Sequence, residues 1–432
     1  MEFRSAELEV LQKLNSKLEI KTVELFAGVG GFRLGLESNK AFKVVWSNQY
    51  EPSTKVQHAS RIYTKNFSNA NHSNDDIEEI VLNNLEIIPG HDLLVGGFPC
   101  QDYSVAKGVN KAQGLVGKKG VLWWSIYEIL RKHKSPPDYL ILENVDRLLN
   151  SPGMARGRDF AVMLASLNDL NYIVEWRVIN AADYGMPQKR KRIFILAYKK
   201  NSKISNHLIK DNNNLSWLVK KGLFAKSFPI EEKFTLEKEF RLNETLDKLS
   251  DSSMFSEKKS LFENTGIAID RNIISLKSTP KYDGERINLK DILINDNLVS
   301  KEFFLNKKDL TRWKFLKGAK TGFKTTKEGH TYPYSEGKMS FPDSLDKPGR
   351  TIITKEGGNA PSRFKHVVLG SSKKLRRLTP IELERLNMFP DDHTKDELIS
   401  DSNRAFLMGN ALVVGIIKKI ANQMVNFLNN DE

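Results

Sequence analysis

The sequence predicts an α/β protein with a mostly parallel sheet covered on both faces. Over the first 200 residues, short apolar runs alternate with helix-like segments. Two of these runs, His91–Val95 and Tyr139–Leu142, are short and apolar-rich, as buried parallel strands are. The length of 432 residues, 40% of them hydrophobic, is enough to bury a large core in two to three domains.

The elements follow in order along this first part. Lys21–Phe26 predicts a strand, and a glycine-rich turn leads from it into a helix at Phe32–Glu37. Phe42–Trp46 predicts the second strand, and the two apolar runs predict the next two. The remaining elements are a helix at Asp159–Leu170, with Asp159 as its N-cap, and strands at Tyr172–Asn180 and Arg192–Tyr198.

The texture changes after Tyr198, where periodicity is weak and Asn, Lys and Ser are mixed with short apolar segments. This stretch predicts a second domain or a large insertion. Within it, residues 310–375 hold 14 Lys and Arg against 5 Asp and Glu, interleaved with aromatic residues. That pattern suits loops that lie in a DNA groove, although a solvated, irregular β region would have the same composition.

The end of the chain becomes helical again. In Thr379–Met388, Thr379 is the expected N-cap, proline follows it, and Glu382 completes a capping box. A final amphipathic helix is predicted at about 414–428.

Composition excludes several classes of protein. The 67 Lys and Arg against 53 Asp and Glu give a net charge of +14, which points to a polyanionic partner such as nucleic acid, although a soluble protein that is merely basic would have the same balance. A single Cys excludes a disulfide framework and a Cys-type zinc site, and it fits a reducing cytosol. No apolar run reaches 18 residues, so we expect no membrane span, and the first 20 residues do not have the pattern of a signal peptide.

Two glycine-containing turns follow predicted strands. In the first, Phe26-Ala27-Gly28-Val29-Gly30-Gly31, the glycines permit a tight turn and close approach to a ligand, and Phe26 suits stacking on an adenine ring. The second, Gly96–Gln101, places the only Cys, Cys100, just past a strand end, where ligands bind in open α/β sheets. The alternatives are a generic strand–helix connection and a buried, inert thiol.

Three further segments carry polar side chains to the same edge. Gln101–Gly120 is rich in Gly and Lys and reads as a mobile basic lid, or else as a plain surface loop. Glu143 follows a buried strand and could donate a proton, or it could simply cap a helix. Arg190 and Arg192 alternate, so both would point to one face if the strand begins there.

With these motifs in order on one scaffold, the chain resembles the DNA (cytosine-5)-methyltransferases of bacterial restriction–modification systems. The resemblance covers residues 21–198 and 376–428 and rests on FAGVGG (Phe26–Gly31), GGFPCQ (Gly96–Gln101), ENV (Glu143–Val145), QKRKR (Gln188–Arg192), RRLTPIELERLNMFP (Arg376–Pro390) and GNALVV (Gly409–Val414).

The resemblance implies a Rossmann-like fold that uses S-adenosyl-L-methionine, yields S-adenosyl-L-homocysteine and needs no metal. It implies an N-terminal helical extension at 1–20, a catalytic and cofactor-binding domain at 21–200, a smaller irregular target-recognition domain at 201–375 and a returning segment at 376–432. The implied partner is duplex DNA, with a cognate restriction endonuclease acting separately. We expect a monomer in the bacterial cytoplasm.

Roles carry over residue by residue. The cofactor would be held by the turn residues Phe26, Ala27, Gly28, Val29, Gly30 and Gly31 and by Gln49, Tyr50, Asp76, Ile77, Asn410 and Ala411. DNA contacts would come from Gln101, Ser104, Lys118, Lys119 and Thr351. The chain departs from the family pattern at Gln49, where an acidic residue usually binds the ribose hydroxyls, at Glu24, where Asp is usual, and at Ala411, where Ser is usual.

The same resemblance implies a mechanism. Cys100 would attack C6 of a flipped-out cytosine while Glu143 donates a proton or hydrogen bond at N3, Arg192 holds O2 and Arg190 supports the site. Three rivals stay open: a transfer-RNA cytosine methyltransferase, a catalytically silent DNA-binding repressor, and a cysteine hydrolase that pairs Cys100 with His91 or His133.

Overall fold

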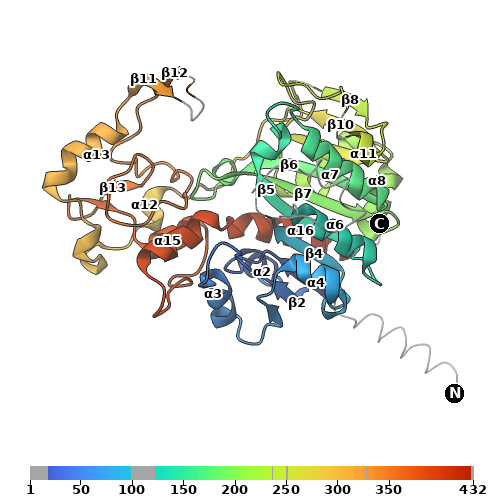
Figure 1. The fold of residues 1–432 in the computed structure, drawn as a ribbon, viewed down its shortest axis with the longest axis horizontal. Helices are drawn as coiled ribbons and strands as arrows, with labels where there is room; N and C mark the ends of the chain where they lie inside the picture. Colours follow the sequence, from blue (N-terminus) through green and yellow to red (C-terminus); the bar gives the residue numbers. More distant parts are fainter. Residues whose placement is uncertain are drawn as a thin grey trace.

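The computed structural model describes residues 18–98, 122–235, 237–249, 252–325, 329 and 331–429. Figure 1 shows a large lobe that contains a central sheet and a smaller lobe built from the later part of the chain. The last helix, α16 (Val414–Asn429), lies under the sheet of the large lobe, so the chain leaves that lobe and returns to it.

The central sheet has ten strands within the described residues, in the order β3-β2-β1-β4-β5-β7-β6-β9-β10-β8. Its first half is parallel and comprises β3 (His72–Ser73), β2 (Phe42–Asn48), β1 (Ile20–Leu25), β4 (Leu93–Gly97) and β5 (Tyr139–Val145). The winding reverses between β1 and β4, and in such sheets ligands bind at the carboxyl ends beside this switch point. The predicted α/β fold class is confirmed, with the parallel strands gathered in this half of the sheet.

The second half of the sheet is antiparallel and extends past residue 200. It comprises β7 (Lys191–Lys199), β6 (Tyr172–Asn180), β9 (Thr265–Ile269), β10 (Asn272–Leu276) and β8 (Glu237–Arg241). Three of these strands come from the stretch expected to form a separate domain. The expected division at residue 200 therefore does not coincide with the edge of the sheet.

Helices cover both faces of this sheet. One face carries α4 (Ile77–Asn83), α6 (Leu122–Lys132), α7 (Arg158–Asp169) and the short α11 (Leu246–Leu249). The other carries α2 (Gly31–Leu36), α8 (Lys203–Asp211), α9 (Asn214–Ser216), the π-helix η4 (Trp217–Lys221), α10 (Leu223–Ser227) and α16. A Cβ atom at Gly35 would lie 2.5 Å from Cβ of Ile417, so glycine lets α2 and α16 pack closely.

The smaller lobe is irregular. Its elements are α12 (Leu289–Ile292), α13 (Leu310–Lys317), the ribbon strands β11 (Lys320–Thr325) and β12 (Thr331–Glu336), β13 (Val367–Leu369), β14 (Leu375–Arg377), α14 (Pro380–Leu386) and α15 (Asp401–Asn410). Short 3₁₀ turns link them at Asp296–Leu298, Lys301–Phe303 and Lys307–Asp309. Its apolar cluster includes Val29, Ala59 and Ile62 of the large lobe, so the two lobes share packing.

Local sequence patterns place most helix ends correctly. The capping box at Thr379 is confirmed, with its side chain accepting from Glu382 N and the Glu382 carboxylate accepting from Thr379 N. The expected N-cap Asp159 is wrong, because Gly157 caps α7 and the buried Asp159 carboxylate instead accepts from Ser151 Oγ at 2.9 Å. The connecting elements α3 (His58–Asn66), η1 (Leu85–Ile87), η2 (Asp146–Asn150) and η3 (Ala181–Tyr184) complete the large lobe.

Among the described helices, none is long and apolar enough on its own to cross a membrane. Only α15 and α16 together would meet those requirements, and they are bent by 41°.

Candidate active site

The glycine-rich turn after β1 is held in an unusual backbone conformation. Gly28 and Gly30 have φ of 55° and 87°, where glycine carries no steric cost, and the non-glycine Phe26 also has a positive φ of 53°. A Cβ atom at Gly28 would meet nothing within 4 Å, so open space lies beside this turn. The turn can therefore bring its backbone close to a ligand.

The end of β2 supports this turn through Gln49. The side-chain Oε1 of Gln49 accepts a hydrogen bond from Gly28 N at 2.7 Å, and Ala27 N donates to Asn48 O at 3.0 Å. Gln49 is buried, while the neighbouring Tyr50 is exposed. The uncharged amide thus shapes the turn itself, a role that the sequence did not indicate.

Other predicted cofactor residues lie around the same strand ends. The Asp76 carboxylate caps α4 by accepting from Glu78 N at 2.9 Å, and Ile77 packs in the core. Val29 is buried against the returning C-terminal segment, where Ala411 is half-buried in the same apolar cluster and Asn410 is exposed at the end of α15. The glycine-rich turn and the returning segment around 411–414 therefore pack against each other.

A buried carboxylate lies beneath this region. Glu24, in β1, is fully buried and accepts a hydrogen bond from Tyr63 Oη at 2.8 Å, and its Oε1 has no hydrogen-bond partner. Burial raises the pKa of Glu24 to about 8. The side chain is therefore protonated in the folded protein at neutral pH.

Glu24 should make the folded protein less stable as the pH rises. Its carboxyl loses a proton near pH 4.5 when unfolded but only near pH 8 when folded. Its contribution to the free energy of unfolding is full below the unfolded pKa and is lost as the pH rises to the folded pKa. Between the two pKa values the free energy of unfolding falls by about 1.4 kcal/mol per pH unit at most. The free energy of unfolding, measured with urea between pH 6 and 8, should decrease less steeply with pH for Glu24→Gln than for the wild type. Equal slopes would contradict the prediction.

The centre of the site is an ion pair at the carboxyl end of β5. Arg192 Nε lies 3.0 Å from Glu143 Oε1, and the two side chains are 18% and 14% exposed. Glu143 lies within β5 rather than after it, and Arg192 lies in β7, paired with Val145. Burial raises the pKa of Glu143, although the positive charges of Arg192 and Arg190 oppose this. A protonated carboxyl held by a cation can donate to a ligand.

The strand next to this pair leads toward Cys100. Gly97 is paired with Glu143, and a Cβ atom at Gly97 would lie 3.3 Å from Glu143 Oε2. Asn144 Nδ2 donates to Phe98 O at 3.1 Å, which fixes the chain two residues before Cys100 in the sequence. The predicted residues Cys100, Gln101, Ser104, Lys118 and Lys119, and the predicted lid Gln101–Gly120, lie outside the described residues.

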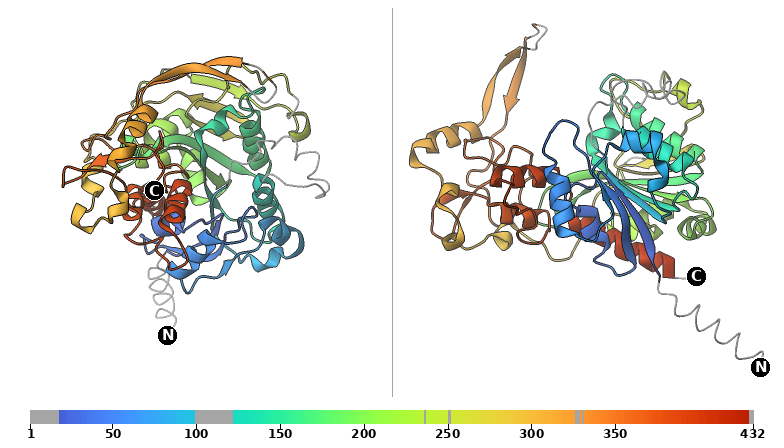
Figure 2. Two further views of the ribbon diagram at one scale, coloured as in Figure 1. Left: turned by 60° about the vertical axis from the view of Figure 1, so that its left-hand side comes forward. Right: turned by 60° about the horizontal axis from the view of Figure 1, so that its bottom comes forward.

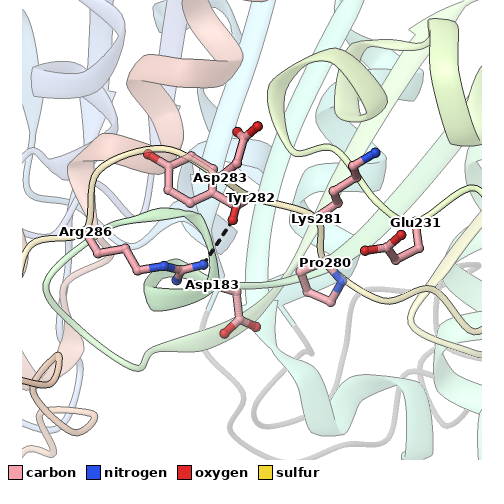
Figure 3. A pocket seen from close by; sticks show the side chains of 7 residues that line it. All are labelled: Asp183, Glu231, Pro280, Lys281, Tyr282, Asp283 and Arg286. Carbon is pink, nitrogen blue, oxygen red and sulfur yellow. Dashed lines mark hydrogen bonds between the residues drawn. The ribbon is translucent and has the colours of Figure 1, made fainter.

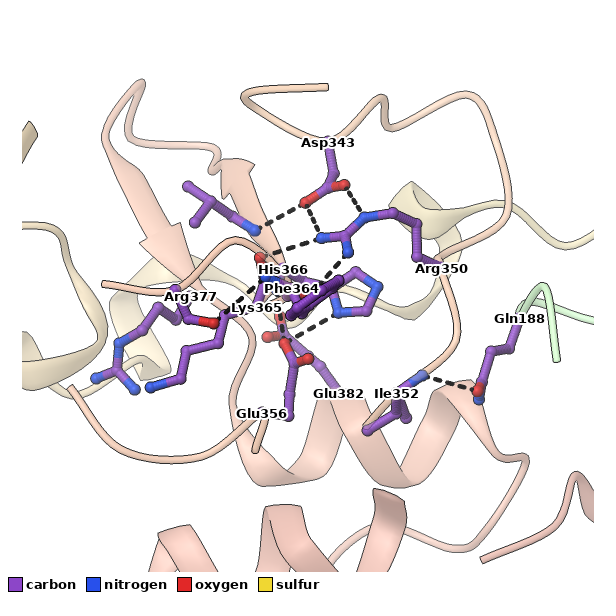
Figure 4. Close-up of polar contacts among 12 residues, drawn as sticks. Gln188, Asp343, Arg350, Ile352, Glu356, Phe364, Lys365, His366, Arg377 and Glu382 are labelled. Carbon is purple, nitrogen blue, oxygen red and sulfur yellow. Dashed lines mark hydrogen bonds and ion pairs between the residues drawn. The ribbon is translucent and has the colours of Figure 1, made fainter. Parts of the chain in front are cut away.

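A short segment of the smaller lobe, Gly349–Ile352, is bonded to the residues before β7 (Figure 4). Gly349 N donates to Pro187 O and Lys189 N donates to Gly349 O, both at 2.7 Å. Ile352 N donates to the buried Gln188 Oε1 at 3.1 Å, and the Thr351 hydroxyl donates to Lys189 O. We call Gly349–Ile352 the strap, because it ties the smaller lobe to the active-site strand.

Arg190 is bonded to the strap and is not exposed at the active site. Because β7 begins at Lys191, Arg190 does not alternate with Arg192 on one strand face. It is 2% exposed, and its guanidinium donates to Ile352 O at 3.2 Å and Gly409 O at 3.0 Å. Arg190 therefore fits the supporting role, while Arg192 alone contacts Glu143.

His91 and His133, the partners that a cysteine hydrolase would need, lie away from the strand end that leads toward Cys100. His91 precedes β4 and lies against His133, with ring centroids 5.3 Å apart. Both therefore lie at the amino end of the strand, whereas Glu143 and Gly97 lie at the carboxyl end. No group of three or more His, Cys, Asp or Glu among the described residues could hold a metal ion.

A hollow of about 420 Å³ lies elsewhere, on η3 and the loop at 280–286 (Figure 3). Its lining mixes the acidic Asp183, Glu231 and Asp283 with the basic Lys281 and Arg286. None of the predicted site residues lines it, so the candidate site is the strand-end region and not this hollow.

Solved structures share this fold. The chain aligns with the Dnmt2 methyltransferase of S. pombe at a TM-score of 0.57 and 14% identity, covering 95% of this chain and 100% of that one. The variant DNMT2 of Spodoptera frugiperda aligns at a TM-score of 0.56 and 16% identity, again over 95% of this chain and 100% of that one. At such identities the likeness concerns the fold alone. The chain therefore has the Rossmann-like fold that these two methyltransferases have.

Sequence relatives give the family. The model of the C-5 cytosine-specific DNA methylase family matches residues 20–426. The chain is 46% identical to the type II methyltransferase M.Sau3AI of Staphylococcus aureus, over 96% of this chain and 98% of that protein. It is 34% identical to the type II methyltransferase M.HhaI of Haemophilus parahaemolyticus, over 48% of this chain and 58% of that protein. The chain belongs to the C-5 cytosine-specific DNA methylase family and is a cytosine-5 DNA methyltransferase.

Proposed function

We propose that the protein methylates C5 of a flipped-out cytosine in a specific duplex DNA sequence through a covalent bond between Cys100 and C6. The Glu143–Arg192 pair carries this proposal, because it sits beside the segment Gly97–Phe98 that leads into Cys100. A carboxyl with a raised pKa at this place suits proton donation to a cytosine ring.

Each of the side chains Cys100, Glu143 and Arg192 has its own role in the proposed reaction. The Cys100 thiolate forms a bond to C6, while the Glu143 proton moves to N3 and takes up the charge that enters the ring. Arg192 holds O2, and the cytosine becomes an enamine with a nucleophilic C5. After C5 is methylated, a base removes the C5 proton, the S–C6 bond breaks to return the thiolate, and the N3 proton returns to Glu143.

The turn after β1 fits a methyl donor such as S-adenosylmethionine, because open space lies beside Gly28. Phe26, which is half-buried and lies against the end of β4, would contact the adenine ring. Gln49 and the backbone of the turn would orient the rest of the molecule. When bound, this cofactor supplies an electrophilic methyl group on a sulfonium.

The DNA partner follows from charge and architecture. Flipping a base out of the duplex costs a few kcal/mol, which contacts to phosphates and bases must offset. The smaller lobe contains the basic stretch 310–375, and its strap reaches the active-site strand. Thr351 lies at this junction, where a DNA backbone beside a flipped base would pass.

The likeness to M.Sau3AI extends over nearly the whole chain. We therefore propose a role in restriction–modification, in which methylation protects host DNA from a cognate endonuclease that acts separately. The protein would work as a monomer in the bacterial cytoplasm.

Trapping on fluorinated DNA tests the covalent route. DNA from cells that express the protein is first sequenced after bisulfite treatment, which reveals the methylated sequence. A duplex with that sequence and 5-fluorocytosine at the target should then form an adduct that survives denaturing gel electrophoresis, because fluorine cannot leave as a proton does.

Two controls complete this test. An unfluorinated duplex should give product without adduct, and transfer RNA should accept no methyl groups. Methylation of the duplex without any adduct would contradict the covalent step, whereas methylation of transfer RNA alone would contradict the proposed substrate.

A further inference from the structure

The strands β11 and β12 form a two-stranded antiparallel ribbon that projects from the smaller lobe (Figure 2). No other strand pairs with this ribbon in the described residues. A lone hairpin is only marginally stable in water, so a projecting one needs support at its base or a partner along its face.

The base of the ribbon is firmly held. The Arg363 guanidinium donates to Leu316 O and Gly318 O, both at 3.1 Å, and to Gly337 O. Met339 N donates to Lys317 O at 2.9 Å, just outside the same base of the ribbon. These bonds fix where the ribbon leaves the lobe, although they cover none of its length.

The two faces of the ribbon differ in chemistry. Strand alternation and the register put Lys320, Lys324, Tyr334 and Glu336 on one face. There Lys324 Nζ lies 4.1 Å from the centroid of the Tyr334 ring, and Lys320 Nζ lies 4.7 Å from that of Phe315. Lys320 and Glu336 of this face are thus partnered near the base of the ribbon, whereas Lys324 and Tyr332 remain exposed.

The opposite face has no charged side chain, yet all six of its residues are exposed. They are Thr321, Phe323, Thr325, Thr331, Pro333 and Ser335. Phe323, which is 75% exposed, lies opposite Pro333 in the register, with hydroxyl side chains on both sides. Such a face suits base edges better than phosphates, since phosphates attract cations.

The major groove of duplex DNA matches this element. It admits a two-stranded ribbon, its edges accept and donate hydrogen bonds to Ser and Thr, and the thymine 5-methyl group contacts Phe. Exposed cations at Arg312 and Lys314 of α13, next to the ribbon, could neutralise the flanking phosphates. The neighbouring cations and the side-chain chemistry of the face therefore favour one occupant, the major groove of duplex DNA.

We propose that the face carrying Phe323 reads base edges in the major groove, and that Phe323 contacts the 5-methyl group of a thymine in the recognition sequence. The proposal rests on the proposed function as a methyltransferase of duplex DNA. It assigns part of the sequence specificity to one described element of the smaller lobe.

Deoxyuridine substitution tests this contact, because it removes only the methyl group. In duplexes with the sequence found by bisulfite sequencing, each thymine is replaced in turn by deoxyuridine. One replacement should lower kcat/KM of the wild-type protein about fourfold, the effect of one lost buried methyl group. Phe323→Ala should methylate the thymine duplex more slowly and should show no difference between thymine and deoxyuridine at that position.

Matched variants separate this role from folding. Phe323→Leu keeps an apolar side chain and should retain part of the preference for thymine. Leu298→Ala removes another exposed apolar side chain of the same lobe, 77% exposed and away from the ribbon, and should behave as the wild type.

Several results would overturn the proposal. They are a recognition sequence without an A·T pair, equal wild-type rates on every substituted duplex, or a Phe323→Ala variant that still prefers thymine. Absence of methylation on every duplex, thymine or deoxyuridine, would instead overturn the proposed function and this contact together.

Discussion

Replacing Cys100 by Ala is expected to lower the rate of cytosine methylation by on the order of 10⁴-fold or more, because the thiolate that attacks C6 is lost. Binding of duplex DNA should persist, since the change alters neither the net charge nor the basic smaller lobe. The measurements are single-turnover methyl transfer and an electrophoretic DNA-binding assay on the same preparations.

The chain offers a clean control for this variant. Cys100 is its only Cys, so no second thiol can substitute for it. Cys100→Ser replaces the thiol by a hydroxyl group of similar size, which is a far weaker nucleophile, and the variant should be nearly as inactive as the Ala variant. Turnover by Cys100→Ala at a tenth of the wild-type rate would remove Cys100 from the mechanism.

Replacing Glu143 by Gln is expected to lower the same rate by about 10²- to 10⁴-fold. The Gln amide can still accept a hydrogen bond from Arg192 and donate one to N3, but it cannot deliver a proton. The variant therefore separates proton transfer from hydrogen bonding at one position. Its DNA binding should match that of the wild type.

The pH dependence sharpens this test. The pKa of Glu143 is raised by burial, so the carboxyl keeps its proton to a higher pH than usual, and wild-type activity should fall as the pH rises through that value. Gln has no proton to lose, so the decline at high pH should disappear in Glu143→Gln. An unchanged decline would assign it to another group.

Four of the five strands of the parallel half could be predicted from the sequence because they are encoded locally, whereas the two-residue β3 was missed. Apolar runs such as Tyr139–Leu142 are buried on both faces, and the glycine-rich turn after β1 appears where its spacing indicates. Placing Glu143 at the carboxyl edge then follows from the direction of its strand. The family resemblance added the role of Arg192, which the structure does bring against Glu143.

Long-range pairing could not be predicted in the same way. The strands β8–β10 have weak patterns, and β9 finds its partner β6 across some ninety residues, as in the pair Val174 and Ala268. The partners of Gln188 are more remote still, because Ile352 lies 164 residues and Asn387 199 residues further along the chain. Nothing near Gln49 in the sequence indicates that its amide would hold Gly28.

The strands β8, β9 and β10, which follow residue 200, belong to the catalytic sheet, and this has a practical consequence for building chimaeras. If a recognition domain from a relative were joined at residue 200, β6 would lose its hydrogen bonds to β9. It would then be an unpaired edge strand, which favours aggregation. Junctions placed after Leu276 and before Val414 would keep the sheet whole and carry the strap with the lobe that it anchors.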